Sequence, residues 1–181
     1  MSESEHGNAS SILATPLRVT QAIELAAFVG REFAPGRWLS MTQDAIDRFV
    51  ALTGDRNRIH TDVARATQAL PAARTIVPGQ LLLALVPTLL QEAYAVTGPE
   101  QGMVAAIRSV RFRQPVHPGD AFRLRARLTL VERRKHFVQV DTACDLELMS
   151  GRRALTSQRT DTFHQAAPNV GDPHRPSACY G

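Results

Sequence analysis

The chain has 181 residues, of which 44% are hydrophobic and 21% charged. These proportions are ordinary for a globular domain and exclude disorder along the whole length. At this length we expect one domain. The formal net charge is only +4, and no run of five or more basic residues is present, so nucleic-acid binding is not expected.

The sequence also bears on the cell compartment. Cys144 and Cys179 form no metal-binding pattern, and two thiols so far apart are typical of a reducing environment. The first fifteen residues show no secretory signal. The longest apolar run, residues 81–90, falls short of the about twenty residues that a membrane-spanning helix needs. We therefore expect a cytoplasmic protein with no membrane segment, no metal and no cofactor of its own.

The two ends of the chain differ from its middle in composition. Residues 1–16 are rich in Ser, Glu and Asn, and residues 165–181 contain several Pro and Gly. Neither segment offers enough apolar residues for a core. We expect two flexible tails around a single domain over residues 17–164.

Three helices are predicted in the first half of that domain. Apolar residues recur at helical spacing over 21–33 and 42–53, and a short helix fits 62–68. Thr42 is placed to cap the second helix, and Gly54 is placed to end it.

The second half changes from helix to strand. Residues 79–96 are apolar nearly all round, which predicts a helix surrounded by protein and kinked at Pro87. Beyond it, apolar residues alternate with polar ones, as in half-exposed antiparallel strands. The predicted strands cover residues 103–113, 122–130, 138–148 and 153–163. The expected fold class is α+β, with a curved antiparallel sheet wrapped around a long central helix.

The segment that follows the second helix holds a candidate acid–base pair. Asp55 and His60 are five residues apart, so neither a helix nor a strand would bring their side chains together. They converge only if the intervening residues form a loop. A carboxylate and an imidazole that meet at one water are suited to proton transfer. Taken alone, the residues fit a turn-capping Asp and a packed His better than a catalytic pair.

Several motifs in a fixed order resemble the MaoC-like hydratase family, and more narrowly its NodN-like branch. The resemblance covers roughly residues 30–164 and is carried by the following stretches: WLSMTQDAIDRF (38–49), TGD (53–55), IHTD (59–62), IVPGQL (76–81) and VRFRQPVHPGD (110–120).

The resemblance implies a hot-dog fold, a homodimer and a specific activity. That activity is (R)-specific hydration of a trans-2-enoyl-CoA, or the reverse dehydration. The family's catalytic Asp and His fall on Asp55 and His60, and the glycine whose N–H binds the thioester carbonyl falls on Gly79. Asn57 and Arg58 lie inside the motif and are weaker candidates for substrate binding.

The chain departs from the family pattern at three places. Pro78 stands where a His usually precedes the glycine, Val104–Ala106 replace an Asn-Tyr-Gly run, and Arg58 replaces Pro or a bulky residue. These departures leave open a hot-dog protein that binds acyl thioesters, or serves as an assembly subunit, without turnover. A hot-dog thioesterase is a further alternative, although its own motif is missing.

The remaining question concerns the carrier of the acyl group, which is either coenzyme A or an acyl carrier protein. Guanidinium groups pair with phosphates, so the arginines of the predicted strands are candidates for a coenzyme A contact. An ordinary solvated strand face is the favoured alternative. The arginines concerned are Arg108, Arg111, Arg113, Arg123, Arg125 and Arg127.

Overall fold

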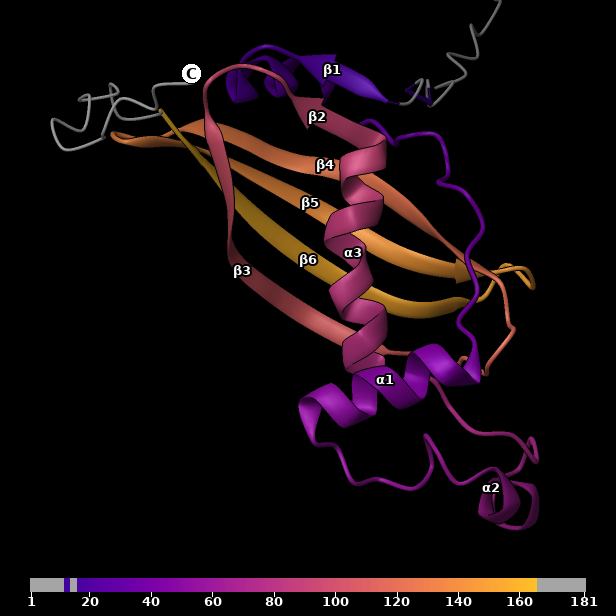
Figure 1. Ribbon diagram of the computed structural model, residues 1–181. Coiled ribbons are helices and arrows are strands. Elements are labelled where there is room, and N and C mark those ends of the chain that lie inside the picture. The colour runs from indigo at the N-terminus through magenta and orange to yellow at the C-terminus, as the bar shows by residue number, and fades with distance from the viewer. Residues whose placement is uncertain (1–11, 14–15, 166–181) are drawn as a thin grey trace, which may run out of the picture.

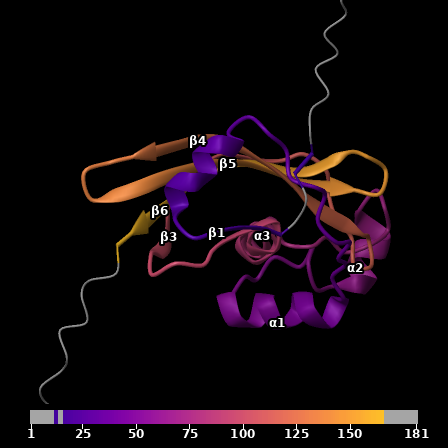
Figure 2. The same ribbon diagram turned by 90° about the horizontal axis from the view of Figure 1, so that it is seen from above.

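The computed structural model describes residues 12–13 and 16–165. The expected tails, 1–16 and 165–181, lie almost wholly outside the described residues. A curved sheet arches over helix α3 (Gly79–Ala93), which runs along its inner side (Figures 1 and 2). Helices α1 (Gln43–Thr53) and α2 (Val63–Ala69) lie beyond the N-terminal end of α3. The predicted α+β architecture is confirmed.

The main sheet has four antiparallel strands in the order β3-β6-β5-β4. They are β3 (Gln101–Phe112), β4 (Phe122–Arg133), β5 (Phe137–Leu148) and β6 (Arg153–His164). All four strands were expected within a few residues of these bounds, because half-buried antiparallel strands alternate apolar and polar residues.

The inner face of the sheet supplies most of the core. On β4, Phe122, Leu124, Ala126 and Leu128 are buried, as the alternation predicted. Leu130 leaves this phase and is exposed, because the pairing with β5 shifts register between residues 128 and 130. A one-residue shift moves a side chain to the other face of a sheet.

Helix α1 begins and ends where its capping residues predicted. The Thr42 hydroxyl accepts a hydrogen bond from the Ala45 N–H at 3.2 Å. Gly54 ends the helix in the left-handed region at φ 70°, where a side chain would be strained. Helix α2 follows Asp62, whose carboxylate accepts from the Arg65 N–H at 2.9 Å.

The predicted helix over 21–33 is wrong in both type and length. Residues Ala22–Phe28 form a 3-10 helix, η1, which buries Ala22 and Leu25 at its three-residue spacing. The chain then turns to run beside β4. The N–H of Gly30 donates to the Leu128 carbonyl at 2.8 Å, and similar bonds follow as far as residue 39. This pairing covers the outer edge of β4 and outweighs the helical preference.

The central helix is also shorter than predicted. It ends at Ala93, and Tyr94–Val96 form strand β2 in parallel with β1 (Leu17–Val19). An aromatic and a β-branched residue suit a strand once a partner lies alongside. The helix continues through Pro87.

The helix is not surrounded on every side within the described chain. Leu82, Val86 and Leu89 are buried against the sheet, whereas Ala84 and Thr88 are exposed. No helix among the described residues is both long enough and apolar enough to cross a membrane.

Candidate active site

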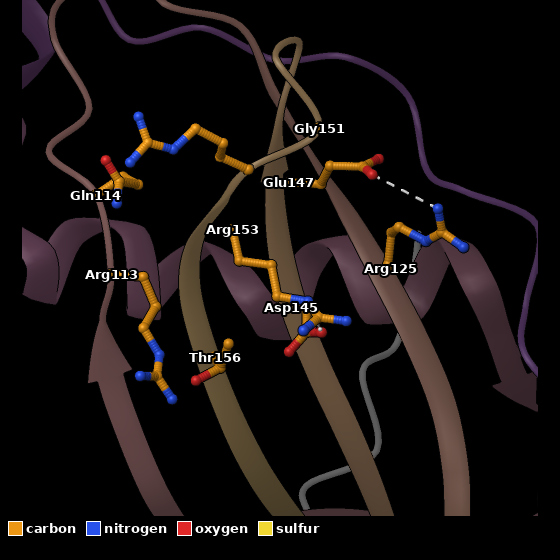
Figure 3. A pocket seen from close by; sticks show the side chains of 9 residues that line it. Arg113, Gln114, Arg125, Asp145, Glu147, Gly151, Arg153 and Thr156 are labelled. Carbon is orange, nitrogen blue, oxygen red and sulfur yellow. Dashed lines mark ion pairs between the residues drawn. The ribbon is translucent and has the colours of Figure 1, made fainter.

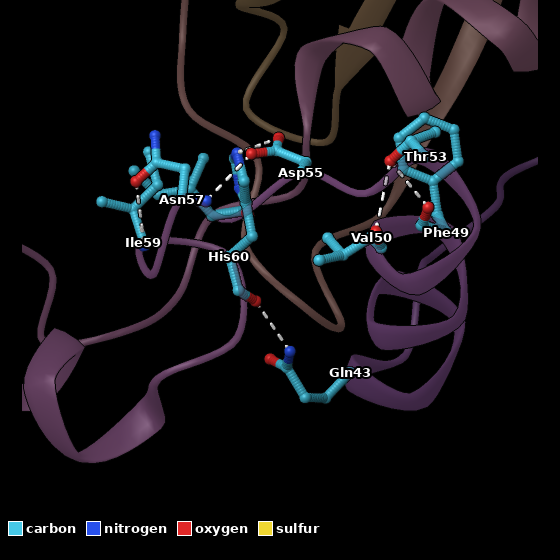
Figure 4. Close-up of polar contacts among 9 residues, drawn as sticks. Gln43, Phe49, Val50, Thr53, Asp55, Asn57, Ile59 and His60 are labelled. Carbon is cyan, nitrogen blue, oxygen red and sulfur yellow. Dashed lines mark hydrogen bonds and ion pairs between the residues drawn. The ribbon is translucent and has the colours of Figure 1, made fainter.

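The loop after α1 brings Asp55 and His60 together, which their spacing permitted only if the intervening residues form a loop. The Asp55 Oδ2 and His60 Nε2 atoms are 3.7 Å apart. That separation is too long for a direct hydrogen bond, yet it keeps both groups within reach of one shared water. In Figure 4 the two side chains point toward each other across the loop.

Local backbone contacts shape this loop. Asp55 Oδ1 accepts a hydrogen bond from the Asn57 N–H at 2.9 Å, and the Asn57 carbonyl accepts from the His60 N–H at 3.2 Å. The first contact is an Asx turn, closed by the Asp55 side chain, and the second is a turn closed by the backbone. Asp and Asn are common in such turns. Together with the left-handed Gly54, these turns reverse the chain so that residues 55 and 60 can meet.

A carbonyl fixes the orientation of the His60 ring. The Nδ1 atom lies 2.6 Å from the Ile76 carbonyl oxygen, which can only accept, so Nδ1 carries the proton. In the neutral ring Nε2 is then an acceptor, and it faces Asp55. His60 is only 7% exposed. Asp55 and His60 therefore present two hydrogen-bond acceptors at the same place.

Residues outside the loop hold it in place. The Gln43 side chain donates to the His60 carbonyl at 2.8 Å and accepts from the Thr75 hydroxyl at 2.6 Å. His117 Nδ1 lies 2.8 Å from the Thr75 carbonyl. Sequence reasoning did not assign these supporting roles. Gln43 and His117 did lie within the motifs that carry the resemblance, and that was the available signal.

A pocket of about 340 Å³ opens at the N-terminal end of α3. Its lining includes His60, Gly79 and Phe112, but not Asp55, which borders His60 from outside the lined volume. The Gly79 N–H belongs to the first turn of α3 and bonds no other group in the described part of the chain. Such an N–H, at the positive end of a helix, is suited to holding an oxygen that gains negative charge.

The Phe112 ring leaves no room for a side chain at position 79. An added Cβ would lie 2.6 Å from the Phe112 ring, a separation that the ring would have to relieve by moving. The space that a side chain at position 79 would occupy is therefore filled by the Phe112 ring. Phe112 belongs to β3 and is 54% exposed.

The two weaker candidates lie outside the pocket. Asn57 is exposed, and its side-chain oxygen accepts from the Ile59 N–H at 3.3 Å. Arg58 is exposed, and its carbonyl accepts from the Asp62 N–H at 2.9 Å. Neither side chain lines the described pocket, and a contact with substrate stays a prediction for both.

The arched sheet and the helix inside it define a hot-dog fold. The sequence matches the MaoC-like domain over residues 24–149, more than two-thirds of the chain, and the chain belongs to this family. Membership in the NodN-like branch stays a prediction.

Named relatives agree with this assignment. The 3-hydroxyacyl-thioester dehydratase Z of Mycobacterium tuberculosis is 36% identical over 109 residues, which cover 60% of this chain and 72% of that protein. A solved (R)-hydratase of A. caviae, involved in PHA biosynthesis, is 25% identical, with a TM-score of 0.61 over 74% of this chain and 94% of its own. An R-hydratase of Pseudomonas aeruginosa shares the fold at 22% identity, with a TM-score of 0.62 over 76% and 82% of the two chains.

Proposed function

We propose that this protein adds water to a trans-2-enoyl-CoA to give an (R)-3-hydroxyacyl-CoA, and that it catalyses the reverse dehydration. The observation that carries the proposal is the facing pair of acceptors, Asp55 and His60, 3.7 Å apart at a pocket that His60 and Gly79 help to line. The named relatives act on 3-hydroxyacyl thioesters or are hydratases, which supports the same chemistry.

The mechanism follows from these acceptors. A water between Asp55 and His60 donates one hydrogen bond to each, which leaves its lone pairs free to attack Cβ of the enoyl group. As the new C–O bond forms, Asp55 takes a proton from the water. The electron pair of the Cα=Cβ bond moves onto the thioester oxygen, where the Gly79 N–H stabilises the negative charge. The proton held by Asp55 then passes to Nε2 of His60, which carries none in the neutral ring, and from His60 to Cα, so that the elements of one water are added and both side chains return to their starting states.

The stereochemistry offers a direct test. The purified protein is incubated separately with (R)- and (S)-3-hydroxybutyryl-CoA, and formation of the enoyl thioester is followed by mass spectrometry. We expect dehydration of the (R) compound and almost none of the (S) compound. Equal dehydration of both, or release of free coenzyme A, would contradict the proposal, and free thiol would indicate a thioesterase.

Binding without turnover is the second candidate function. It is favoured by the Phe112 ring, which fills the space in front of Gly79, and by Pro78, which replaces the usual His. A protein of this kind would bind crotonyl-CoA in a calorimeter without changing it. Binding together with an unchanged enoyl group would therefore favour this candidate over the hydratase.

The partner in the assembly is also a proposal. Strand β3 lies at the edge of the sheet, pairs on one side only within the described residues, and carries exposed apolar side chains at Met103, Val104 and Ile107. Unpaired apolar edges tend to add another strand, and an antiparallel edge can pair with a second copy of itself. We therefore expect a homodimer through β3.

Light scattering tests the dimer. An Ile107→Arg variant should have the mass of a monomer, because it places a charge on the pairing edge. Leu52→Arg changes an exposed residue of α1 and serves as a matched control that should stay dimeric. A monomeric parent protein, or a dimer that survives Ile107→Arg, would contradict the expected interface.

A further inference from the structure

A second and larger pocket, of about 560 Å³, lies on the outer face of the sheet near the turn between β5 and β6. Its strand residues alternate with buried ones, so their side chains point away from the core. Asp145, for example, lies between the buried Cys144 and Leu146. Figure 3 shows the labelled side chains gathered over several strands below the hairpin that contains Gly151.

The charges in this pocket do not cancel. Arg153 pairs with Asp145 at 2.8 Å, and Arg125 pairs with Glu147 at 3.5 Å. These two pairs account for both carboxylates in the lining. The lining has two further guanidinium groups, on Arg113 and Arg152, and neither forms an ion pair among the described residues.

The outer pocket and the proposed active site share part of their lining. Arg113 and Gln114, which directly follow β3, line both the outer pocket and the pocket that contains His60 and Gly79. The N–H of Arg113 donates to the Ala154 carbonyl at 2.8 Å, which ties this segment to β6. A ligand that extends from the first pocket past these two residues would meet two guanidinium groups that form no ion pair with any described residue.

The geometry points to a binding site for the phosphates of coenzyme A in the outer pocket, with Arg113 and Arg152 as the contacting groups. The inference rests on the proposed function, which places the thioester beside Gly79. The pantetheine arm is a flexible chain that carries the phosphates away from the sulfur. Guanidinium groups bind phosphate oxygens through paired, charge-assisted hydrogen bonds. An anionic ligand would neutralise the charges of Arg113 and Arg152, which the two carboxylates of the pocket do not pair with.

Calorimetry with coenzyme A, dephospho-coenzyme A and pantetheine tests the site directly, since none of these compounds reacts. We expect coenzyme A to bind at least about tenfold more tightly than pantetheine, with dephospho-coenzyme A in between, because each lost phosphate removes a charge-assisted contact. The affinity for coenzyme A should fall as salt is added.

Two variants assign the effect to the pocket. Arg152→Gln should weaken coenzyme A binding about tenfold, since it removes one phosphate partner. Arg133→Gln is the matched control, because Arg133 is also exposed and without an ion pair among the described residues but lies at the far end of β4. It should change the affinity by less than about twofold. Equal binding of pantetheine and coenzyme A, or unchanged binding in Arg152→Gln, would overturn the inference.

Turnover measurements distinguish a failure of the phosphate site from a failure of the proposed hydratase function. The ratio of kcat/KM for crotonyl-CoA to that for crotonyl-pantetheine should fall in Arg152→Gln and hold in Arg133→Gln. Turnover with no dependence on Arg152 would remove the phosphate site and leave the hydratase. If coenzyme A binding depends on Arg152 but no turnover is seen, the phosphate site would stand and the hydratase proposal would fall. Preference for a crotonyl thioester of an acyl carrier protein, weakened by Arg152→Gln, would show that the pocket serves a protein carrier and that the coenzyme A assignment is wrong.

Discussion

Replacing Gly79 with Ala tests both the packing of Phe112 against this position and the proposed role of the Gly79 N–H. The new Cβ would lie 2.6 Å from Cε1 and 2.8 Å from Cδ1 of the Phe112 ring. The ring is 54% exposed and can turn toward solvent, so the cost should be near the lower end of the about 1–3 kcal/mol seen for overpacking. Ala also favours the helix over Gly by roughly 0.5–1 kcal/mol. The free energy of unfolding should therefore change by less than about 1 kcal/mol.

The same substitution should affect activity far more than stability. The new methyl group and the movement of the ring both alter the lining of the pocket of about 340 Å³ that we propose receives the thioester. Poor placement of the carbonyl against the amide should lower kcat/KM by about tenfold or more. Thermal unfolding by circular dichroism and loss of the enoyl absorbance of crotonyl-CoA measure the two effects.

A second substitution sharpens the test. Gly79→Ala combined with Phe112→Ala removes the clash, so it should return the unfolding temperature to the value of Phe112→Ala alone. A folded Gly79→Ala protein with full activity would refute the reasoning, because substrate would then not approach this amide.

Three further predictions concern the acid–base pair and the buried polar groups. Asp55→Asn should fold normally, since the Asn oxygen can still accept from the Asn57 N–H, but kcat for crotonyl-CoA hydration should fall by about 10²–10⁴-fold. Burial raises the pKa of the Cys144 thiol from 9.0 to about 12, so the unfolded chain ionises first, and about 4 kcal/mol of stability should be lost as the pH rises through this window. Urea unfolding at several alkaline pH values checks this, and Cys144→Ala should remove this part of the loss, while the loss due to Tyr94, whose pKa burial also raises, should remain. Arg159 and Asp161 form a buried ion pair at 2.7 Å, so Arg159→Met alone should cost about 3–5 kcal/mol in urea unfolding. The double change with Asp161→Leu should recover most of that loss; equal instability of the single and double variants would count against the pairing.

The elements that the sequence predicted correctly depend on local rules. Thr42 and Gly54 cap α1 through contacts within a few residues of the chain, and alternation alone located the four long strands. The two errors depend on distant partners. Residues 30–39 follow β4 through bonds to residues about ninety positions away, and Tyr94–Val96 pair with β1. Helical spacing carries no information about either partner.

The sequence likewise identified some features of the candidate site and missed those that depend on distant contacts. Asp55 and His60 were identified from residue type, spacing and resemblance, and the structure brings them together. The groups that orient them were not identified, because the Ile76 carbonyl that holds the His60 ring belongs to the backbone and leaves no trace in the residue type. The Phe112 ring over Gly79 also depends on how β3 approaches α3, which residue order does not reveal.

The central claim is that Asp55 and His60 act on one water beside an enoyl thioester. The most direct measurement is the rate at which the conjugated enoyl absorbance of crotonyl-CoA disappears with the parent protein and with folded Asp55→Asn and His60→Gln variants. The account predicts rapid loss with the parent and a rate close to that of buffer with either variant. Undiminished turnover by Asp55→Asn, or no turnover by the folded parent protein, would contradict it.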